Sequence, residues 1–390
     1  MRYFDANATT PLRPAAMSAW ANAQSSLWQN PASPSSAGAR AASTLEHCRE
    51  QLATLTGTRA SGIVFTSGAT EANNAVAAFE AARTPDACAI VSAIEHPSVL
   101  EPVKKFFGAR RLRLLPVDAS GTARLDVLKD WLAAGGTTFV SLMAVNNDTG
   151  VVQPVAAAHA LAALHGARFH CDATQWFGKF PAGGLPACDY ISGSAHKFGG
   201  PKGTGFLIFD TVRNAAFSGQ CGGGQEHGRR AGTVNLPGIA AMLAALDEAD
   251  AEAAEENTAR EAARTRFEEI VLQEIPGAHI HGSTAQRAWN TVSLALPRHD
   301  NLRWMKRLER LGFTVSTGSA CASLDGSPSH TLAAMGCDSA VVRRTLRLSA
   351  YWETLPSDWH MLAGALGQTA RALDEEARHT DPESGVITVP

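Results

Sequence analysis

The sequence predicts an α/β fold with a mostly parallel central sheet, and three observations support this prediction. Short apolar runs that are typical of strands alternate with helical stretches from about Leu45 to Gly205, which is the pattern of parallel α/β sheets. Several of these runs end in polar groups, at the position where open α/β sheets bind their ligands. A different pattern follows Thr233 and indicates a second, smaller domain.

The region after Thr233 starts with a long, alanine-rich and charged stretch, 239–275, which predicts a helix with a solvated face. It leads into a smaller α+β region, where we expect strands at 290–296 and 345–349 and a helix at 302–311. We therefore place a large α/β domain at 13–255 and a small α+β C-terminal domain at 1–12 and 256–390.

The composition is that of an ordinary globular enzyme. The chain has 390 residues, 45% of them hydrophobic, and a formal net charge of −3, so we expect no direct contact with nucleic acid or a membrane. We see no signal peptide and no apolar run long enough to cross a bilayer, which favours the cytoplasm. Seven cysteines without a Cys-x-x-Cys pair fit reduced thiols and predict no metal site.

Lys197 lies between two apolar runs, 188–191 and 206–209, and is followed by a glycine-rich stretch, 199–205. A lysine at the end of a buried strand, in surroundings that favour the neutral amine, can form an imine with an aldehyde cofactor. Pyridoxal phosphate (pyridoxal 5'-phosphate) is the natural candidate. The alternative is a solvated loop lysine, the usual state of this residue type.

Two other segments supply what such a cofactor needs. Asp172 follows a predicted short strand, 167–171, and could keep the pyridine nitrogen protonated; otherwise it caps the next turn. The segment 66–71, Thr-Ser-Gly-Ala-Thr-Glu, joins a predicted strand to a predicted helix, so its backbone N–H groups could bind the phosphate. The alternative is an ordinary helix start capped by Ser67 or Thr70.

Three more residues have a suggestive context. His96 and Asn147 follow predicted strands, and a histidine there could stack on the cofactor ring and move protons, or be a hydrogen-bonded loop residue. Cys321 lies near the centre of a small, polar stretch, 316–328, whereas other cysteines lie in apolar runs. It can act as a thiolate nucleophile, or be a passive loop cysteine.

Together these segments resemble a cysteine desulfurase, a member of the class V branch of the fold type I pyridoxal phosphate enzymes. The resemblance runs from about residue 4 to residue 349, and the stretch around Cys321 resembles the long-cysteine-loop subgroup, which supplies sulfur for iron–sulfur cluster assembly and tRNA thiolation. The most specific segments are 66–71, 95–96, 145–147, 172–175, 196–197, 222–226, 230–233 and 318–321.

The resemblance implies a role for each candidate residue. Lys197 would hold the cofactor covalently and move the substrate's Cα proton, Cys321 would attack the substrate sulfur, and His96 would stack on the ring and take the thiol proton. Asn147 and Arg347 would hold the substrate carboxylate, for which the planar guanidinium is well suited. Thr233 would reach the phosphate in the partner subunit of a homodimer. The remaining implied cofactor-binding residues are Ala69, Thr70, Asp172, Gln175, Ser194 and His196.

The activity implied by the resemblance is conversion of L-cysteine to L-alanine, with the sulfur passed to Cys321 as a persulfide and then to an acceptor protein. The alternatives are a selenocysteine lyase, another pyridoxal phosphate-dependent carbon–sulfur lyase, or a non-catalytic partner of a desulfurase. The chain departs from the family pattern at four places. His227 stands where arginine is usual, Ser36 lies in a segment that often holds a histidine, Ala350-Tyr351-Trp352 is bulky, and the tail 380–390 is unlike the end that docks scaffold proteins in relatives.

Overall fold

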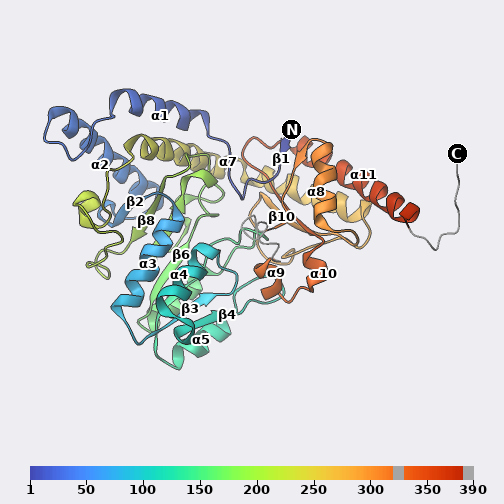
Figure 1. The fold of residues 1–390 in the computed structure, drawn as a ribbon, viewed down its shortest axis with the longest axis horizontal. Coiled ribbons are helices and arrows are strands. Elements are labelled where there is room, and N and C mark those ends of the chain that lie inside the picture. Colours follow the sequence, from blue (N-terminus) through green and yellow to red (C-terminus); the bar gives the residue numbers. More distant parts are fainter. Residues whose placement is uncertain (319–328, 381–390) are drawn as a thin grey trace.

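The computed structural model describes residues 1–318 and 329–380, and the chain forms a larger and a smaller lobe (Figure 1). The larger lobe is built around a seven-stranded sheet. In this sheet β8 is antiparallel to both of its neighbours and the other pairs are parallel, so the predicted mostly parallel sheet is confirmed. The strand order is β2 (Ile63–Thr66), β8 (Gly205–Phe209), β7 (Tyr190–Ser194), β6 (Arg168–Asp172), β5 (Thr137–Ser141), β3 (Cys88–Ser92), β4 (Leu112–Leu115).

Helices cover both faces of this sheet. Ile63 and Phe65 pack on one face with α1, α2, α5, α6 and the first half of α7, whereas Val64 packs on the other face with α3 and α4. This alternation follows from the two-residue period of a strand, and burial on both faces explains why the strands read as continuous apolar runs. The helices are α1 (Pro14–Ser26), α2 (Ser36–Thr56), α3 (Ala69–Arg83), α4 (Pro97–Phe107), α5 (Leu125–Ala133), α6 (Val155–Leu164) and α7 (Leu236–Glu274).

The strand that the sequence predicts before Asn147 is β5, and it ends at Ser141, earlier than expected. The N–H groups of Leu142 and Ala144 still donate to the carbonyls of His170 and Asp172. Val145 then forms an isolated bridge with Val152. The chain thus leaves the sheet gradually, and this brings the segment 145–149 to the carboxyl edge of the strands.

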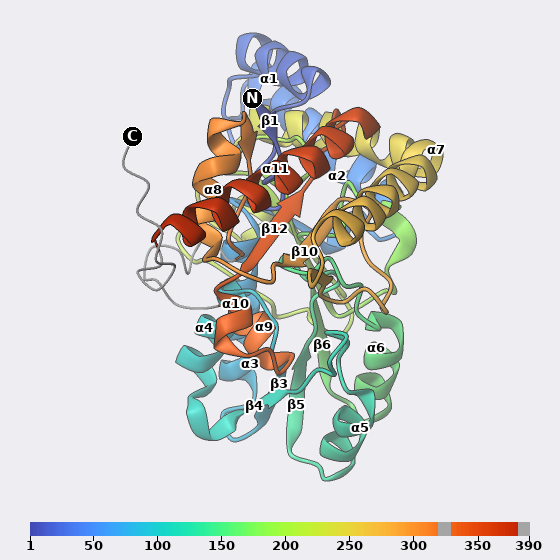
Figure 2. The ribbon, with the colours of Figure 1, turned by 90° about the vertical axis from the view of Figure 1, so that its right-hand side faces the viewer.

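The smaller lobe is an α+β unit with its own apolar core. An antiparallel sheet of β12 (Thr345–Ser349), β10 (Thr291–Ala295) and β9 (His279–Ile280) packs under α11 (Pro356–Thr380), as Figure 2 shows. A two-stranded parallel pair, β1 (Arg2–Tyr3) and β11 (Phe313–Thr314), lies beside it. The other helices are α8 (Asn301–Arg310), α9 (His330–Ala334) and α10 (Ser339–Val342).

Two segments connect the lobes. The long helix α7 contributes Leu243 and Leu246 to the core of the larger lobe and Phe267 and Val271 to the core of the smaller one. The domain boundary that we placed after residue 255 falls inside this helix and stays a prediction. The N-terminal segment starts in the smaller lobe, where Phe4 is buried, and then crosses to the larger one.

Short 3₁₀-helices complete the described part of the chain: η1 (Ala60–Gly62), η2 (Ala109–Arg111), η3 (Ala182–Gly184), η4 (Ala195–Lys197) and η5 (Gln225–Gly228). Across residues 1–318 and 329–380, no helix combines the length and the apolar content needed to span a bilayer.

Candidate active site

A cavity of about 550 Å³ lies where the carboxyl ends of the parallel strands face the N-terminal segment and the smaller lobe. Of the predicted site residues, Thr233 is exposed and does not line it, and Cys321 lies outside the described residues. The structure brings the others together around one space. The predicted residues that line the cavity are Ala69, Thr70, His96, Asn147, Asp172, Gln175, Ser194, His196, Lys197 and Arg347.

Lys197 is the last residue of η4, which directly follows β7 at the carboxyl edge of the sheet. Its Nζ donates hydrogen bonds to the main-chain carbonyls of Asn7, at 2.6 Å, and Ala8, at 2.9 Å. The N-terminal segment therefore fixes the direction of the amine. The same carbonyl of Asn7 accepts a hydrogen bond from Gln175 Nε2 at 3.1 Å, so one turn of main chain orients two of the predicted residues.

The helix start at Ala69 lies on the cavity wall, where the sequence predicts a cradle for the phosphate. Gly68 is the N-cap of α3, and no side-chain cap bond is made there within the described chain, so the first N–H groups of the helix could bind an anion at the end where the helix dipole is positive. Gly205 of β8 passes directly beneath, and a Cβ there would lie 2.5 Å from Gly68 Cα. The hydroxyls of Thr70 and Ser194 line the same space.

His196 also lines the cradle, and its pKa is depressed to about 4 by burial and by the nearby amines of Lys197, Lys202 and Lys179. Its Nδ1 lies 3.1 Å from Thr9 Oγ1. At neutral pH the ring is therefore uncharged, and it offers a hydrogen bond to an anion instead of a full charge.

Asp172 is buried at the end of β6, and both of its oxygens are engaged. Oδ1 accepts from the Thr174 N–H at 2.9 Å, and Oδ2 accepts from Asn73 Nδ2 at 2.9 Å. Asn73 is a residue that the sequence analysis missed. It also donates to Ser98 Oγ at 3.0 Å and accepts from Ser192 Oγ at 2.6 Å, so it joins α3 to two strands and to the start of α4.

His96 is the N-cap of α4, and its ring is neutral and oriented by Ser98. The Ser98 N–H donates to His96 Nδ1 at 3.1 Å, so the proton of the neutral ring is on Nε2. Burial is the main cause that lowers the pKa of His96, and the charge of Lys197 lowers it further against the opposing effect of Asp172. The ring can take a second proton on Nδ1 only if it gives up the bond from the Ser98 N–H.

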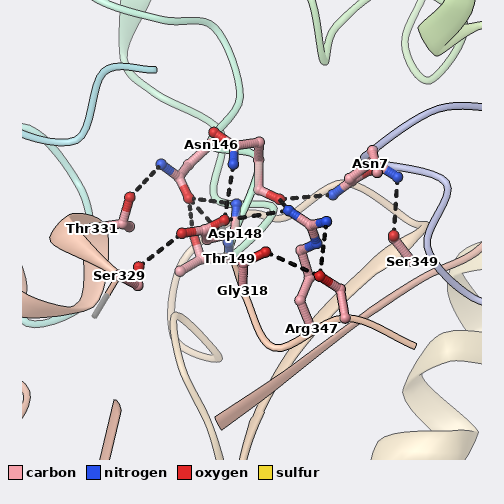
Figure 3. A network of polar contacts seen from close by, with 12 residues as sticks. Asn7, Asn146, Asp148, Thr149, Gly318, Ser329, Thr331, Arg347 and Ser349 are labelled. Carbon is pink, nitrogen blue, oxygen red and sulfur yellow. Dashed lines mark hydrogen bonds and ion pairs between the residues drawn. The ribbon is translucent and has the colours of Figure 1, made fainter. Parts of the chain in front are cut away.

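Arg347, from β12 of the smaller lobe, is buried on the cavity wall and paired with two carboxylates. Figure 3 shows it beside Asp148. Its Nη2 lies 2.7 Å from Asp5 Oδ1, and its Nη1 lies 3.4 Å from Asp148 Oδ1. Its buried Nε has no hydrogen-bond partner among the described residues. Because Nε is not used and Nη1 makes only a long contact, this guanidinium can still bind a carboxylate.

Two more buried polar atoms on the cavity wall, Gln175 Oε1 and Thr174 Oγ1, lack a partner within the described chain. Buried polar atoms are nearly always satisfied in a functional state. A ligand with a phosphate, a donor facing Gln175 and a ring nitrogen facing Asp172 would satisfy this set, so the residues present fit pyridoxal phosphate. Among the described residues no cluster of His, Cys, Asp or Glu side chains could hold a metal ion.

Other cavity-lining residues had no clear signal in the sequence. His330 comes from α9 and bonds the Glu95 carbonyl through Nε2 at 2.8 Å. Asn7 comes from the N-terminal segment, 190 positions away from Lys197. A polar residue that follows an apolar strand can be found from the sequence. The contacts of Asn7 with Lys197 and of His330 with Glu95 join distant segments and are seen only in the tertiary fold. The further unpredicted lining residues include Ser98, Met143, Thr174 and Lys202.

The departure at His227 lies outside the cavity, on an exposed turn. The neighbouring Glu226 is buried and has φ 49°. It forms a two-point ion pair with Arg49, with both N–O distances at 2.9 Å, and accepts from the Phe65 N–H at 2.8 Å. This contact fixes the glycine-rich segment to α2 and β2, whatever side chain follows at position 227. The bulky Trp352 packs under Arg13, whose Cζ lies 4.2 Å from the ring centroid.

Comparisons with known proteins agree with this geometry. The family model described as "Aminotransferase class-V" matches residues 2–358. A protein named cysteine desulfurase from Sinorhizobium fredii (strain NBRC 101917 / NGR234) is 37% identical over 340 residues, which cover 86% of this chain and 87% of that protein.

Solved structures give the same result. A structure titled "NIFS-LIKE PROTEIN" superposes with a TM-score of 0.86 at 30% identity, and the match covers 95% of this chain and all of that one. Another, titled "SspA in complex with cysteine", has a TM-score of 0.76 at 28% identity over 90% of this chain and 98% of that one. The chain therefore belongs to the class-V aminotransferase family of pyridoxal phosphate-dependent enzymes, in the branch of the cysteine desulfurases.

Proposed function

We propose that this chain is a pyridoxal phosphate-dependent cysteine desulfurase, which converts L-cysteine to L-alanine and passes the sulfur to Cys321. One observation carries the proposal. A single cavity brings together the amine of Lys197, the carboxylate of Asp172 and the buried guanidinium of Arg347, whose Nε has no partner among the described residues. The amine and the carboxylate suit the cofactor, and the guanidinium suits the carboxylate of an amino-acid substrate.

The positions of the lining residues support the following roles. Lys197 would provide the covalent attachment, Asp172 would pair with the pyridine nitrogen, and Gln175 would contact the phenolic oxygen. The start of α3 and the side chains of Thr70, Ser194 and His196 would hold the phosphate. When bound, pyridoxal phosphate supplies an electron sink for the negative charge that is left on the substrate Cα after proton removal.

Arg347 and Asn147 orient the substrate through its carboxylate. The fork of the guanidinium fits a carboxylate at two points. Asn147, which lines the same cavity, has an amide donor, Nδ2, that now donates to Asp148 Oδ1 at 2.8 Å. This orientation places the Cα proton toward Lys197, which removes it and later returns a proton. His96 covers the ring face and handles the proton of the substrate thiol.

The sulfur step needs no outside oxidant or reductant. The Cys321 thiolate attacks the substrate sulfur, the Cβ–S bond breaks, and Cβ receives a proton, so L-cysteine plus a thiol gives L-alanine plus a persulfide. The carbon is reduced and the two sulfurs are oxidised by the same two electrons.

Incubation of the holoenzyme with L-cysteine, followed by amino-acid analysis and peptide mass spectrometry, tests the proposal. We expect alanine to form and the peptide that contains Cys321 to gain one sulfur atom. The Cys321→Ala variant should keep the cofactor's visible absorbance and lose alanine formation. Turnover that persists in this variant would instead identify a lyase that needs no persulfide.

We further propose that the chain works as a homodimer in the cytoplasm and delivers sulfur to an acceptor protein, for iron–sulfur cluster assembly or tRNA thiolation. The exposure of Thr233 supports the dimer, because a residue meant for the partner subunit's phosphate must be accessible on a single chain. Sedimentation at equilibrium tests the dimer. Transfer of ³⁵S from labelled cysteine to candidate acceptors tests the delivery.

A further inference from the structure

Asp148 is the centre of a buried network that joins three separate segments (Figure 3). It is 2% exposed. Its Oδ1 accepts from Asn147 Nδ2 at 2.8 Å and lies 3.4 Å from Arg347 Nη1, and its Oδ2 accepts from Ser329 Oγ at 2.8 Å. One carboxylate thus contacts both residues that we assign to the substrate carboxylate, together with the residue that precedes α9.

The backbone of Asp148 is fixed independently of these contacts. Its N–H donates to Asn146 Oδ1 at 2.9 Å, and the same oxygen accepts from the N–H and the hydroxyl of Thr149. Asn146 in turn donates to the Ile94 carbonyl at 3.2 Å. Because the carboxylate is attached to a rigid turn, it can define where its three partners lie.

Arg347 needs such a guide because it comes from the other lobe. Its guanidinium is held from one side by Asp5 at 2.7 Å and contacts Ser316 Oγ at 3.3 Å. With Asp5 alone, the planar group could rotate toward the N-terminal segment. Asp148 supplies a second carboxylate contact, on Nη1, while Nε has no partner among the described residues.

From this arrangement, and resting on the proposed function, we infer that Asp148 is a positioning residue for substrate selection. It orients Arg347 and Asn147 so that the site accepts amines that carry a carboxylate and discriminates against those that do not. Asp148 does not touch the substrate; it acts through the two residues that do.

The Asp148→Asn variant tests the inference with little change in size. The amide oxygen can still accept from Asn147 and Arg347, and the N–H₂ group can donate to the Ser329 hydroxyl. What the variant removes is the negative charge that holds the Arg347 guanidinium, so the charge-assisted contact with Arg347 is lost. We expect the affinity for L-cysteine to fall about ten- to a hundredfold, the range for a lost hydrogen bond to a charged group, and the affinity for cysteamine, which lacks the carboxylate, to change less than about threefold.

Both affinities are measured from the change in the cofactor's visible absorbance when the holoenzyme is mixed with each amine. The measurement is made in the Cys321→Ala background, where the proposed sulfur transfer cannot occur. It therefore reports on Asp148 even if the desulfurase proposal fails, and alanine formation by the unmodified enzyme tests that proposal separately.

Two further variants complete the experiment. Thr331→Val removes a hydroxyl that lies 3.4 Å from Asn146 Nδ2 and should leave the preference for the carboxylate unchanged. Asp148→Glu keeps the charge and should retain more of the preference than Asp148→Asn. Equal loss of both ligands in Asp148→Asn, no loss of either, or a reversed order of the two Asp148 variants would overturn the inference.

Discussion

The two walls of the cavity are built in different ways. On the wall formed by the large sheet, Asp172 and Lys197 follow strands whose carboxyl ends converge by topology. Asp172 is held by Asn73 and Thr174 of the same lobe, and only the amine of Lys197 reaches the N-terminal segment. On the opposite wall, Arg347 is held by Asp5, Asp148 and Ser316, residues 342, 199 and 31 positions away along the chain. The strand order therefore places the residues of the first wall, whereas the contacts of Arg347 form only when both lobes and the N-terminal segment meet.

This difference separates two kinds of requirement. The cofactor side needs side chains at the carboxyl ends of the strands, a helix N-terminus for the phosphate, and a carboxylate, Asp172, that is oriented by its neighbours. The strands and helices of an α/β fold provide such positions. The substrate side needs a buried guanidinium, that of Arg347, which can still donate hydrogen bonds to the substrate. Asp5 and Asp148 must therefore hold this group without using all of its N–H donors. Variants of the two walls should therefore change different quantities: cofactor binding and turnover for the sheet wall, and KM for the opposite wall.

The largest effect is expected on the sheet wall, from Lys197→Ala. Without the amine, the cofactor has no covalent anchor and no group removes the Cα proton, so we expect alanine formation to fall on the order of 10³-fold or more. The visible absorbance of the bound cofactor should shift as well. Lys129→Ala, an exposed lysine on α5, is the control, and activity in Lys197→Ala near that of this control would refute the assignment.

On the opposite wall, Arg347→Lys should keep the charge and lose the planar fork. We expect KM for L-cysteine to rise about 10- to 100-fold with a smaller change in kcat, because the lysine amine cannot bind a carboxylate at two points. Steady-state kinetics measure this, with the exposed Arg343→Lys as control. A fall in kcat at constant KM would place Arg347 on the reaction itself and remove the contrast between the walls.

The main effect of Asn73→Ala should be a lower free energy of unfolding, with a smaller change in the free energy of substrate binding. It removes the donor to Asp172 Oδ2 and the acceptor for Ser192 Oγ, and a buried polar group left unpaired costs roughly 1–3 kcal/mol. Urea unfolding measures the loss. Asn74→Ala, next in the chain, removes only a bond to the Thr70 carbonyl and should cost less; an equal loss in both variants would show that the network through Asn73 adds nothing.

The smallest effect is expected on the free energy of unfolding at acid pH. It depends on buried histidines, one in each lobe. Burial lowers the pKa of His170, in the large sheet, and of His281, in the smaller lobe, to about 4. The unfolded chain takes up these protons from about pH 6.5 downward and the folded chain does not, so their contribution to stability is lost as pH falls from 6.5 toward 4.

His281→Gln should flatten this dependence by roughly 1–2 kcal/mol between pH 7 and pH 4.5. The measurement is the free energy of unfolding in urea at the two values, with the exposed His165→Gln as control. If His281→Gln and the unsubstituted protein lose the same free energy on acidification, His281 does not contribute to it.

Much of the sheet wall could be predicted from the sequence, because its signals are local. Apolar runs that end in Asp172, His96 or Lys197 identify strand ends, and the predicted strand at 345–349 coincides with β12. Asn73 was missed because a polar residue inside an alanine-rich helix looks solvated. It is buried because the helix turns that face toward β6 and β7.

The sequence by itself determined the alternation of strands and helices and the residue types at the strand ends, which made pyridoxal phosphate the natural candidate cofactor. Both depend on short-range periodicity and on chemistry that each residue carries alone. The tertiary structure alone decided that Asn7 receives the Lys197 amine and that Asp5 and Asp148 share Arg347, because these contacts join segments up to 342 positions apart. Nothing in a local pattern specifies which distant carboxylate meets a buried cation; that is decided by how the two lobes pack.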